Sequence, residues 1–230
     1  MPKLHHFPLC PFSRRARLCM GEYGIDVELV EERPWERREA FFALNPAGTN
    51  PVLVEDDGSA VAGIEAVDEY LEETRSGRLT DVSLFGGNPH QRAEVRRLVA
   101  WFDVKFNAEV TLNLVYEKID RRFMRTSDGG GAPDMAVVRA GRENIRYHLE
   151  YIGFLTESRK WLAGEDLSHA DLAAAAHLSC IDYLGDVPWE VDAHARDWYA
   201  RIKSRPSFRS LLADHLTGMP PPKAYADLDF

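Results

Sequence analysis

One change of pattern divides this sequence and limits the folds that the chain can adopt. Up to residue 76, strand-like runs and stretches of helical spacing follow one another at short intervals. The strand-like runs cover residues 3–8, 27–30, 51–54 and 60–62, and the helical stretches cover residues 12–23, 35–44 and 64–73. From residue 88 onward only long amphipathic helical runs remain, at 90–120, 135–157, 172–184, 192–203 and 208–215. We therefore predict a small mixed β-sheet covered by helices, followed by an all-helical domain.

The boundaries of these parts follow from local signals. The first 76 residues have the order βαβαββα, in which Asp57-Gly58 between two apolar runs indicates a hairpin turn. We assign residues 77–88 to a linker, residues 89–216 to the helical domain and residues 217–230 to a tail. The tail reads TGMPPPKAYADLDF, and its three consecutive prolines prevent a helix from continuing.

Composition narrows the classes of protein. The 230 residues are 45% hydrophobic and carry a formal charge of −9, which disfavours general binding to nucleic acid. The three cysteines show no paired spacing, and no apolar run is long enough to cross a bilayer, so we expect a cytoplasmic protein. The eight histidines are scattered, and the adjacent pair His5-His6 lies on an apparent strand whose neighbours face opposite sides. We therefore predict no metal site.

Three motifs spread over the chain point to one family. They are CPFS at residues 10–13, NPAGTNPVL at residues 45–53 and GEDLSHAD at residues 164–171. With the element order, they make the sequence resemble the glutathione S-transferase family. The resemblance implies a thioredoxin-like N-terminal domain and a C-terminal helical bundle. It also implies that Pro51 follows a cis peptide bond, where Asn50 and Pro51 present backbone groups to the cysteinyl part of glutathione.

The third motif has a structural explanation that is independent of the family. Ser168 is spaced to accept from the backbone N–H of Asp171, while the Asp171 carboxylate reaches back to Ser168. This capping box predicts a helix start and carries no information about activity.

The sequence departs from the family at a position that binds glutathione. Members usually carry an acid followed by serine, which bind the γ-glutamyl end, where this chain has Gly63 and Ile64. Each polar group of glutathione that is left unsatisfied lowers its binding free energy by roughly 1–3 kcal/mol. If the register of the alignment is shifted, Glu65 or Asp68 takes the place of the missing acid. We predict a degenerate glutathione site made of Cys10, Ser13, Asn50, Pro51, Gly63 and Ile64.

Two residues of this site leave alternatives open. Cys10 is either a thiolate stabilised by the following helix and by Arg14 and Arg15, or a compact residue that fills the turn. Ser13 stands where a second cysteine would complete a dithiol cycle, and it either activates a bound thiol or caps the helix. We favour the interpretation that Cys10 fills the turn, that Ser13 caps the helix and that neither residue is catalytic. A glutathione-dependent transferase or thiol transferase using Cys10 or Ser13, with glutathione as its cofactor, is the alternative.

Arginines and the tail suggest a protein partner. Arginine clusters next to aromatic residues such as Trp35 are typical of protein interfaces. Because the chain as a whole is acidic, such local positive charge is suited to binding an acidic partner. Together with the degenerate site, the ending PPPKAYADLDF resembles a bacterial, division-associated branch of the family. That resemblance implies a homodimer without transferase activity that binds FtsZ filaments, promotes constriction at the division site and contacts other division proteins through the tail. We expect the partner-binding residues to be Arg14, Arg15, Trp35, Asp227 and Phe230.

Overall fold

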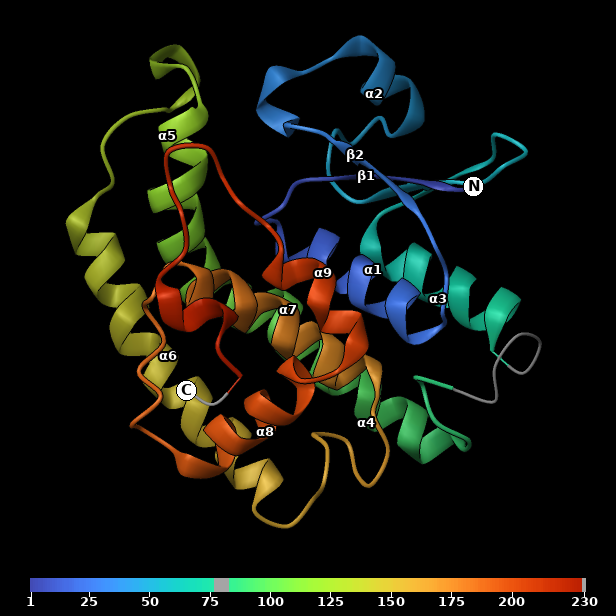
Figure 1. Ribbon diagram of the computed structural model, residues 1–230, viewed down its shortest axis with the longest axis vertical. Helices are drawn as coiled ribbons and strands as arrows, with labels where there is room; N and C mark the ends of the chain where they lie inside the picture. The colour runs from blue at the N-terminus through green and yellow to red at the C-terminus, as the bar shows by residue number, and fades with distance from the viewer. Residues whose placement is uncertain (77–82, 229–230) are drawn as a thin grey trace.

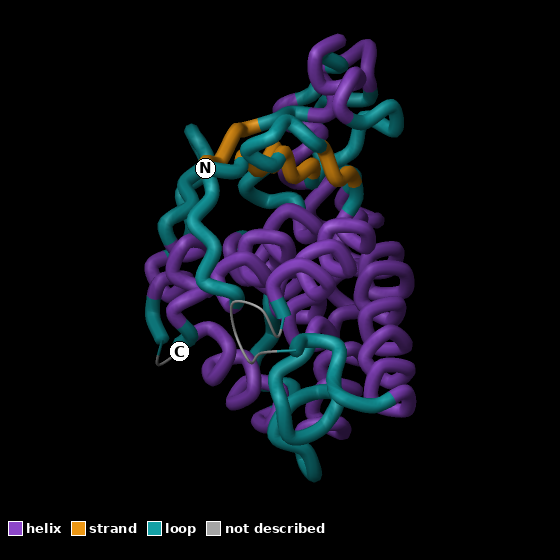
Figure 2. The backbone as a smooth tube through the Cα atoms, turned by 90° about the vertical axis from the view of Figure 1, so that its right-hand side faces the viewer, coloured by secondary structure: helices purple, strands orange, loops and turns teal. Residues whose placement is uncertain are grey.

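The N-terminal part is a four-stranded mixed sheet with helices on both faces (Figures 1 and 2). The computed structural model describes residues 1–76 and 83–228. In order along the chain, the elements are β1 (Lys3–His6), α1 (Pro11–Glu22), β2 (Glu28–Glu31), η1 (Pro34–Glu36), α2 (Glu39–Leu44), β3 (Val52–Val54), β4 (Ala60–Ala62) and α3 (Ile64–Arg75). The strand order is β2-β1-β3-β4, and only the β1–β2 pair is parallel. The order βαβαββα and the Asp57-Gly58 hairpin predicted from the sequence are confirmed.

The register of the sheet places Leu4 and Leu53 at buried positions of the inner strands, whereas Leu29 in the edge strand β2 is 42% exposed. Leu4 of β1 lies opposite Leu29 on one side and Leu53 on the other, and both Leu4 and Leu53 are fully buried. Side chains alternate between the faces of a strand, so the neighbours of these residues face the other side. α1 and α3 pack together on the face toward the helical domain, whereas α2 lies beyond the opposite face (Figures 1 and 2).

The helix predicted over residues 35–44 is divided in two. The short 3-10 turn η1 ends at Arg37, which adopts a left-handed conformation with φ 53°, and α2 starts only at Glu39. A residue in the left-handed conformation cannot continue a right-handed helix. For any residue other than glycine, this conformation also costs conformational free energy. The turn holds Trp35 against Phe7 with their ring centroids 5.0 Å apart.

The C-terminal part is a bundle of helices that lies below the sheet in Figure 2. Its elements are α4 (Pro89–Ala100), η2 (Trp101–Asp120), α5 (Arg121–Phe123), η3 (Thr126–Asp128), α6 (Met135–Thr156), α7 (His169–Tyr183), α8 (Ala193–Lys203), η4 (Pro206–Phe208), α9 (Arg209–Leu212) and η5 (Lys223–Ala226). The run predicted at 90–120 is continuous, but from Trp101 it is wound as a π-helix. Its buried Phe102, Phe106, Val110 and Leu114 recur every four residues, which keeps one apolar face on the core of this looser helix.

The centre of the bundle is α7, all of whose residues are buried. The predicted capping box at its start is confirmed, with the backbone N–H of Ser168 donating to the Asp171 carboxylate at 3.0 Å. The same carboxylate accepts from the backbone of Leu162 at 2.8 Å and from Trp198 Nε1 at 2.9 Å. Asp171 therefore joins three segments of the helical domain as well as capping α7.

The tail docks on its own domain. Tyr225 is fully buried beside Tyr183, with the ring centroids 5.2 Å apart, and its hydroxyl donates to the carbonyl oxygen of Leu211 at 2.9 Å. The hydroxyl of Tyr183 in turn donates to the carbonyl oxygen of Met219 at 2.7 Å. The tail is thus anchored to the core through the side chain of Tyr225, while most of the described tail residues around it are exposed.

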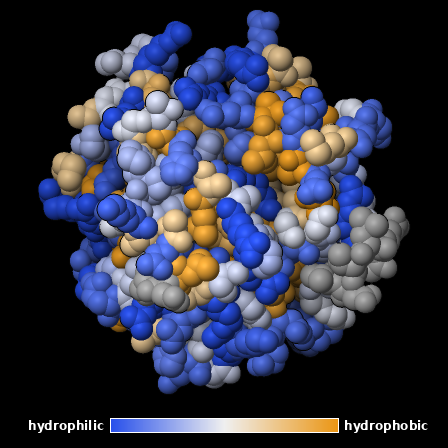
Figure 3. Space-filling model, viewed as in Figure 1, coloured by the Kyte–Doolittle hydropathy of each residue, from blue (hydrophilic) through white to orange (hydrophobic). Residues whose placement is uncertain are grey.

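The face of the molecule shown in Figure 3 is mostly hydrophilic. On the face shown in Figure 3, hydrophobic residues gather in separate patches between charged side chains. Within residues 1–76 and 83–228, no helix combines the length and the apolar character that a membrane span requires.

Candidate functional site

Cys10 lies in the turn between β1 and α1, as predicted, but its surroundings do not favour a thiolate. It occupies the N-cap position of α1, where it makes no capping hydrogen bond. Burial raises the pKa of the Cys10 thiol, and the nearby Asp120 raises it further. Hydrogen bonds from Ser13 lower this pKa, but they offset the increase only in part. Because the thiolate is the reactive form, this position is unfavourable for nucleophilic chemistry.

Ser13 ties the turn together from within α1. It is fully buried as the third residue of the helix, and its Oγ accepts from the backbone N–H of Phe7 at 3.2 Å. The prediction that Ser13 caps the helix is wrong, because the N-cap is Cys10 and the N–H that Ser13 satisfies precedes the helix. Its role in the structure is to hold the strand-to-helix connection.

Arg14 was expected to contact a partner, and that prediction is wrong. Its side chain is fully buried, and its Nε donates to the carbonyl oxygen of Pro8 at 2.6 Å. Its other nitrogens donate to Ser179 at 2.9 Å, to the Tyr225 hydroxyl at 3.0 Å and to Asp214 at 3.1 Å. Arg14 therefore connects the Cys10 turn, α7 and the tail inside the protein.

The prediction for Arg15 is wrong for the same reason. Only 2% of this residue is exposed, and its guanidinium group pairs with Asp68 of α3 and Asp103 of η2. His169 and His177, both on α7, lie 3.5 Å from Asp68 and 3.4 Å from Asp103. Two neighbouring arginines on a helix usually mark a solvated face, but here each reaches carboxylates far away in the sequence.

The glutathione-binding positions are recognisable but incomplete. The Asn50–Pro51 peptide bond is cis, as predicted. Gly63 and Ile64 stand directly after β4 at the start of α3, and neither side chain can bind a carboxylate or an ammonium group. Asp68 is engaged by Arg15 and does not replace the missing acid, whereas Glu65 is exposed in the first turn of α3.

A cavity of about 250 Å³ lies beside the Cys10 turn. It is walled by Cys10, Phe12, Trp35, Leu112 and Tyr116, and the acidic Asp120 at the end of η2 also lines it. Sequence reasoning missed Asp120, because an acid followed by Arg121 and Arg122 is typical of a solvated helix end. Asp120 becomes part of a cavity only because Cys10, Phe12 and Trp35 of the N-terminal domain lie next to it in the folded chain.

Trp35 separates this cavity from a second hollow with a basic rim. The second hollow has a volume of about 460 Å³ and is lined by Trp35, Arg37, Arg38, Phe123 and Arg125, together with Glu36 and Asp128. Arg37 and Arg125 form no ion pair with a carboxylate of the described residues, whereas Arg38 pairs with the buried Glu32. We call this hollow the Trp35 groove.

The expected partner residues do not form one surface. Trp35 lies between the sheet and the η2 end of the bundle, whereas the described end of the tail follows Tyr225, which packs on Tyr183 of α7 and Leu211 of α9. Asp227 is exposed there, and Phe230 lies outside the described residues. Trp35 is therefore the member of the predicted set that combines partial exposure with neighbouring cations.

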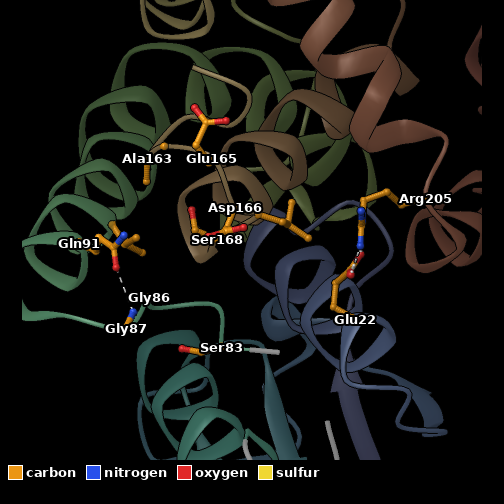
Figure 4. Close-up of a pocket in the computed structure, with 13 residues that line it drawn as sticks. Glu22, Ser83, Gly86, Gly87, Gln91, Ala163, Glu165, Asp166, Ser168 and Arg205 are labelled. Atoms are coloured by element: carbon orange, nitrogen blue, oxygen red, sulfur yellow. Dashed lines mark hydrogen bonds and ion pairs between the residues drawn. The ribbon is translucent and has the colours of Figure 1, made fainter. Parts of the chain in front are cut away.

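Two other clusters carry no reaction chemistry. Figure 4 shows a polar cavity of about 690 Å³, in which Arg205 and Glu22 form an ion pair at 2.6 Å. In the core, donor atoms of Cys19, Asp68 and His169 lie within 4.8 Å of one another. Burial raises the pKa of the Cys19 thiol, and Arg15 already neutralises Asp68, so this cluster is poorly suited to a cation.

Comparisons with known proteins agree with this geometry. The model of the family described as "Glutathione S-transferase, N-terminal domain" matches residues 4–79 of this chain. The chain is 48% identical to FtsZ-localized protein A of Caulobacter vibrioides, over 99% of this chain and 97% of that protein. It is 28% identical to glutathione S-transferase 3 of Zea mays, over 96% of both chains.

Solved structures show the same similarity. FzlA from C. crescentus superposes with a TM-score of 0.93 at 47% identity, covering 100% of this chain and 99% of that one. A crystal structure titled glutathione S-transferase from Sinorhizobium meliloti superposes with a TM-score of 0.96 at 50% identity, over the whole of both chains. The resemblance predicted from the three motifs, and the fold that it implies, are confirmed.

Proposed function

Because the chain belongs to the glutathione S-transferase family and matches FtsZ-localized protein A from end to end, we propose that it is a filament-binding division protein without transferase activity. The similarity to that relative over 97% of its length is the observation that carries the proposal. The name of the relative places it with FtsZ, so the division site is the location that we propose for this chain.

The glutathione positions support a loss of transferase activity. Gly63 and Ile64 offer no side chain to the γ-glutamyl end, and the Cys10 pKa is raised. The cavity beside Cys10 contains the carboxyl group of Asp120 and no basic side chain, which disfavours an anionic tripeptide. Titration calorimetry with glutathione tests this point. We expect no binding at about 10 mM, a threshold of about −2.7 kcal/mol, whereas micromolar binding would favour the transferase that the names of other relatives suggest.

We assign filament contact to the Trp35 groove. Trp35 offers an aromatic face, and Arg37 and Arg125 add positive charge that no carboxylate of the described residues pairs with, on a chain whose formal charge is −9. Aromatic and arginine side chains dominate the binding energy of protein interfaces. The left-handed φ of 53° at Arg37 is a further sign of function, since such conformations gather at binding sites.

Co-sedimentation with GTP-assembled FtsZ polymer tests this assignment. We expect Trp35→Ala and Arg37→Glu each to weaken binding at least tenfold, because one removes the aromatic anchor and the other reverses an unpaired charge. Arg209→Glu on α9 is the matched control, since Arg209 is also exposed and forms no ion pair with any described residue. Wild-type binding by both groove variants would refute the groove, and no sedimentation of the wild type with polymer would refute the function.

We also propose that the chain acts as a homodimer. Val104 on η2 and Phe154 on α6 are large apolar residues with 68% and 69% of their surface exposed, and their burial against a second copy of the chain would stabilise a dimer. A two-fold dimer presents two identical grooves and gains avidity on a filament. Light scattering after gel filtration measures the mass directly. Contact of further division proteins with the exposed end of the tail stays a prediction.

A further inference from the structure

The cavity beside Cys10 has the size and walls of a binding site for a small ligand. Its volume of about 250 Å³ lies just below the usual range for drug-sized ligands. Phe12 and Trp35 from the N-terminal domain, together with Leu112 from η2, provide apolar walls. Polar groups therefore occupy only a small part of the lining, and they decide which ligand the cavity accepts.

Asp120 brings an uncompensated carboxyl group to this cavity. Within the described residues, its side chain makes no hydrogen bond or ion pair. The adjacent arginines point elsewhere, Arg121 to Glu117 at 2.7 Å and Arg122 to the carbonyl oxygen of Gly218 at 3.3 Å. Burial raises the pKa of Asp120 to about 7, and no cation is near enough to oppose this effect. A carboxyl group that packing partly removes from water is ordinarily paired, so the unpaired Asp120, which is half-buried beside a cavity, indicates a ligand.

Asn50 supplies a second acceptor that lacks a donor. Its residue is 7% exposed, and its amide nitrogen donates to the carbonyl oxygen of Glu32 at 2.9 Å, which fixes the orientation of the amide. The Oδ1 atom is then buried without a hydrogen-bond partner in the described chain. Among the residues that the structure describes, no lysine, arginine or histidine lines the cavity. The site thus offers acceptors and negative charge and lacks a matching cationic donor.

We propose that this cavity binds a primary ammonium or amidinium group carried on a short apolar stem. The Asp120 carboxylate pairs with the positive charge, Asn50 Oδ1 accepts from one of its N–H groups, and the stem lies between Phe12, Trp35 and Leu112. Such a ligand removes the cost of the buried charge at Asp120 and fills the apolar walls at the same time. The cavity therefore prefers a positively charged ligand, whereas glutathione carries a net negative charge. This class of ligand differs in this respect from the ligand of the transferases. The group belongs either to a free small amine or to a basic side chain of a partner protein.

Titration calorimetry with matched probes tests the charge preference. Phenethylamine and benzamidine carry the cation, while phenethyl alcohol keeps the apolar stem without it. We expect the amines to bind the wild-type chain at least tenfold more tightly than the alcohol. Equal binding of amine and alcohol, or no amine binding at 10 mM, would overturn the proposal without reference to any variant.

The variant Asp120→Asn tests the residue, with Asp128→Asn as its control. Both substitutions remove one negative charge at nearly constant volume, and Asp128 is an exposed acid that lines the neighbouring Trp35 groove. We expect Asp120→Asn to lose at least tenfold in amine affinity and Asp128→Asn to lose less than twofold. Unchanged amine affinity in a folded Asp120→Asn protein would contradict the assignment.

A chemical footprint locates the ligand and identifies its source. Cys10 is partly exposed in the cavity, whereas Cys19 and Cys180 are buried, so iodoacetamide should modify Cys10 first. Bound amine should slow this modification in the wild type and leave it unchanged in Asp120→Asn. If FtsZ polymer displaces benzamidine, the natural ligand is a basic side chain of the partner, and if polymer has no effect, it is a free amine. An unchanged rate of Cys10 modification at saturating amine would place the ligand elsewhere and overturn the site.

Discussion

Replacement of Arg15 by methionine should destabilise the whole protein. Arg15 is 2% exposed and joins Asp68 of the N-terminal domain to Asp103 of the helical domain. Methionine keeps much of the apolar stem but leaves two buried carboxylates without a cation. Removing one member of a buried ion pair costs about 3–5 kcal/mol. At about 2–4 °C per kcal/mol for a chain of this size, the melting temperature should fall by roughly 6–20 °C.

Thermal and urea unfolding followed by circular dichroism measure this loss. Arg92→Met on α4 is the control, since the Arg92 side chain forms no hydrogen bond or ion pair with the part of the chain that the structure describes. This substitution should change stability by less than about 0.5 kcal/mol. Adding Asp68→Asn and Asp103→Asn to the Arg15 variant removes the uncompensated charges and should recover at least half of the loss. If Arg15→Met costs less than about 1 kcal/mol, or if the triple variant recovers nothing, the carboxylates are not what makes Arg15 necessary.

Two further predictions concern other buried groups. Asp120→Asn should raise the free energy of unfolding by up to about 4 kcal/mol at pH 7 and by almost nothing at pH 4. Burial raises the pKa of Asp120 to about 7, so the native protein holds its proton more tightly than the unfolded chain and loses stability as pH rises from about 4 to about 7. A pH series of urea melts on both proteins checks this, and a pH-independent difference would refute it. Tyr225→Phe should cost about 1–3 kcal/mol, because Arg14 and the carbonyl oxygen of Leu211 each lose a partner in the core. Thermal melts measure that loss, and an unchanged melting temperature would show that the hydroxyl is dispensable.

Local signals in the sequence predicted the features that depend on neighbouring residues. The hairpin at Asp57-Gly58 and the capping box at Ser168 and Asp171 follow from turn and cap chemistry within four residues. The cis peptide before Pro51 followed from the resemblance, which was carried by a contiguous motif. Each of these signals is complete within a short segment, so the rest of the chain adds little to it.

The features that sequence reasoning missed depend on contacts between distant residues. Arg14 and Arg15 look like a solvated pair until Asp214, Asp68 and Asp103 are brought beside them by the fold. Asp120 looks like part of a solvated helix end until the Cys10 turn covers it. Burial of a charged residue is decided by tertiary packing, which helical periodicity and composition do not encode.

The docking of Tyr225 has a practical consequence for deletion mapping. A truncation that removes the last six residues also removes a tyrosine from the centre of the protein and two hydrogen bonds made by its hydroxyl. Loss of partner binding in such a truncated chain would reflect damage to the fold as much as loss of a contact. Deletions intended to map contacts at the end of the tail should therefore begin no earlier than Asp227, which leaves Tyr225 and the rest of η5 in place.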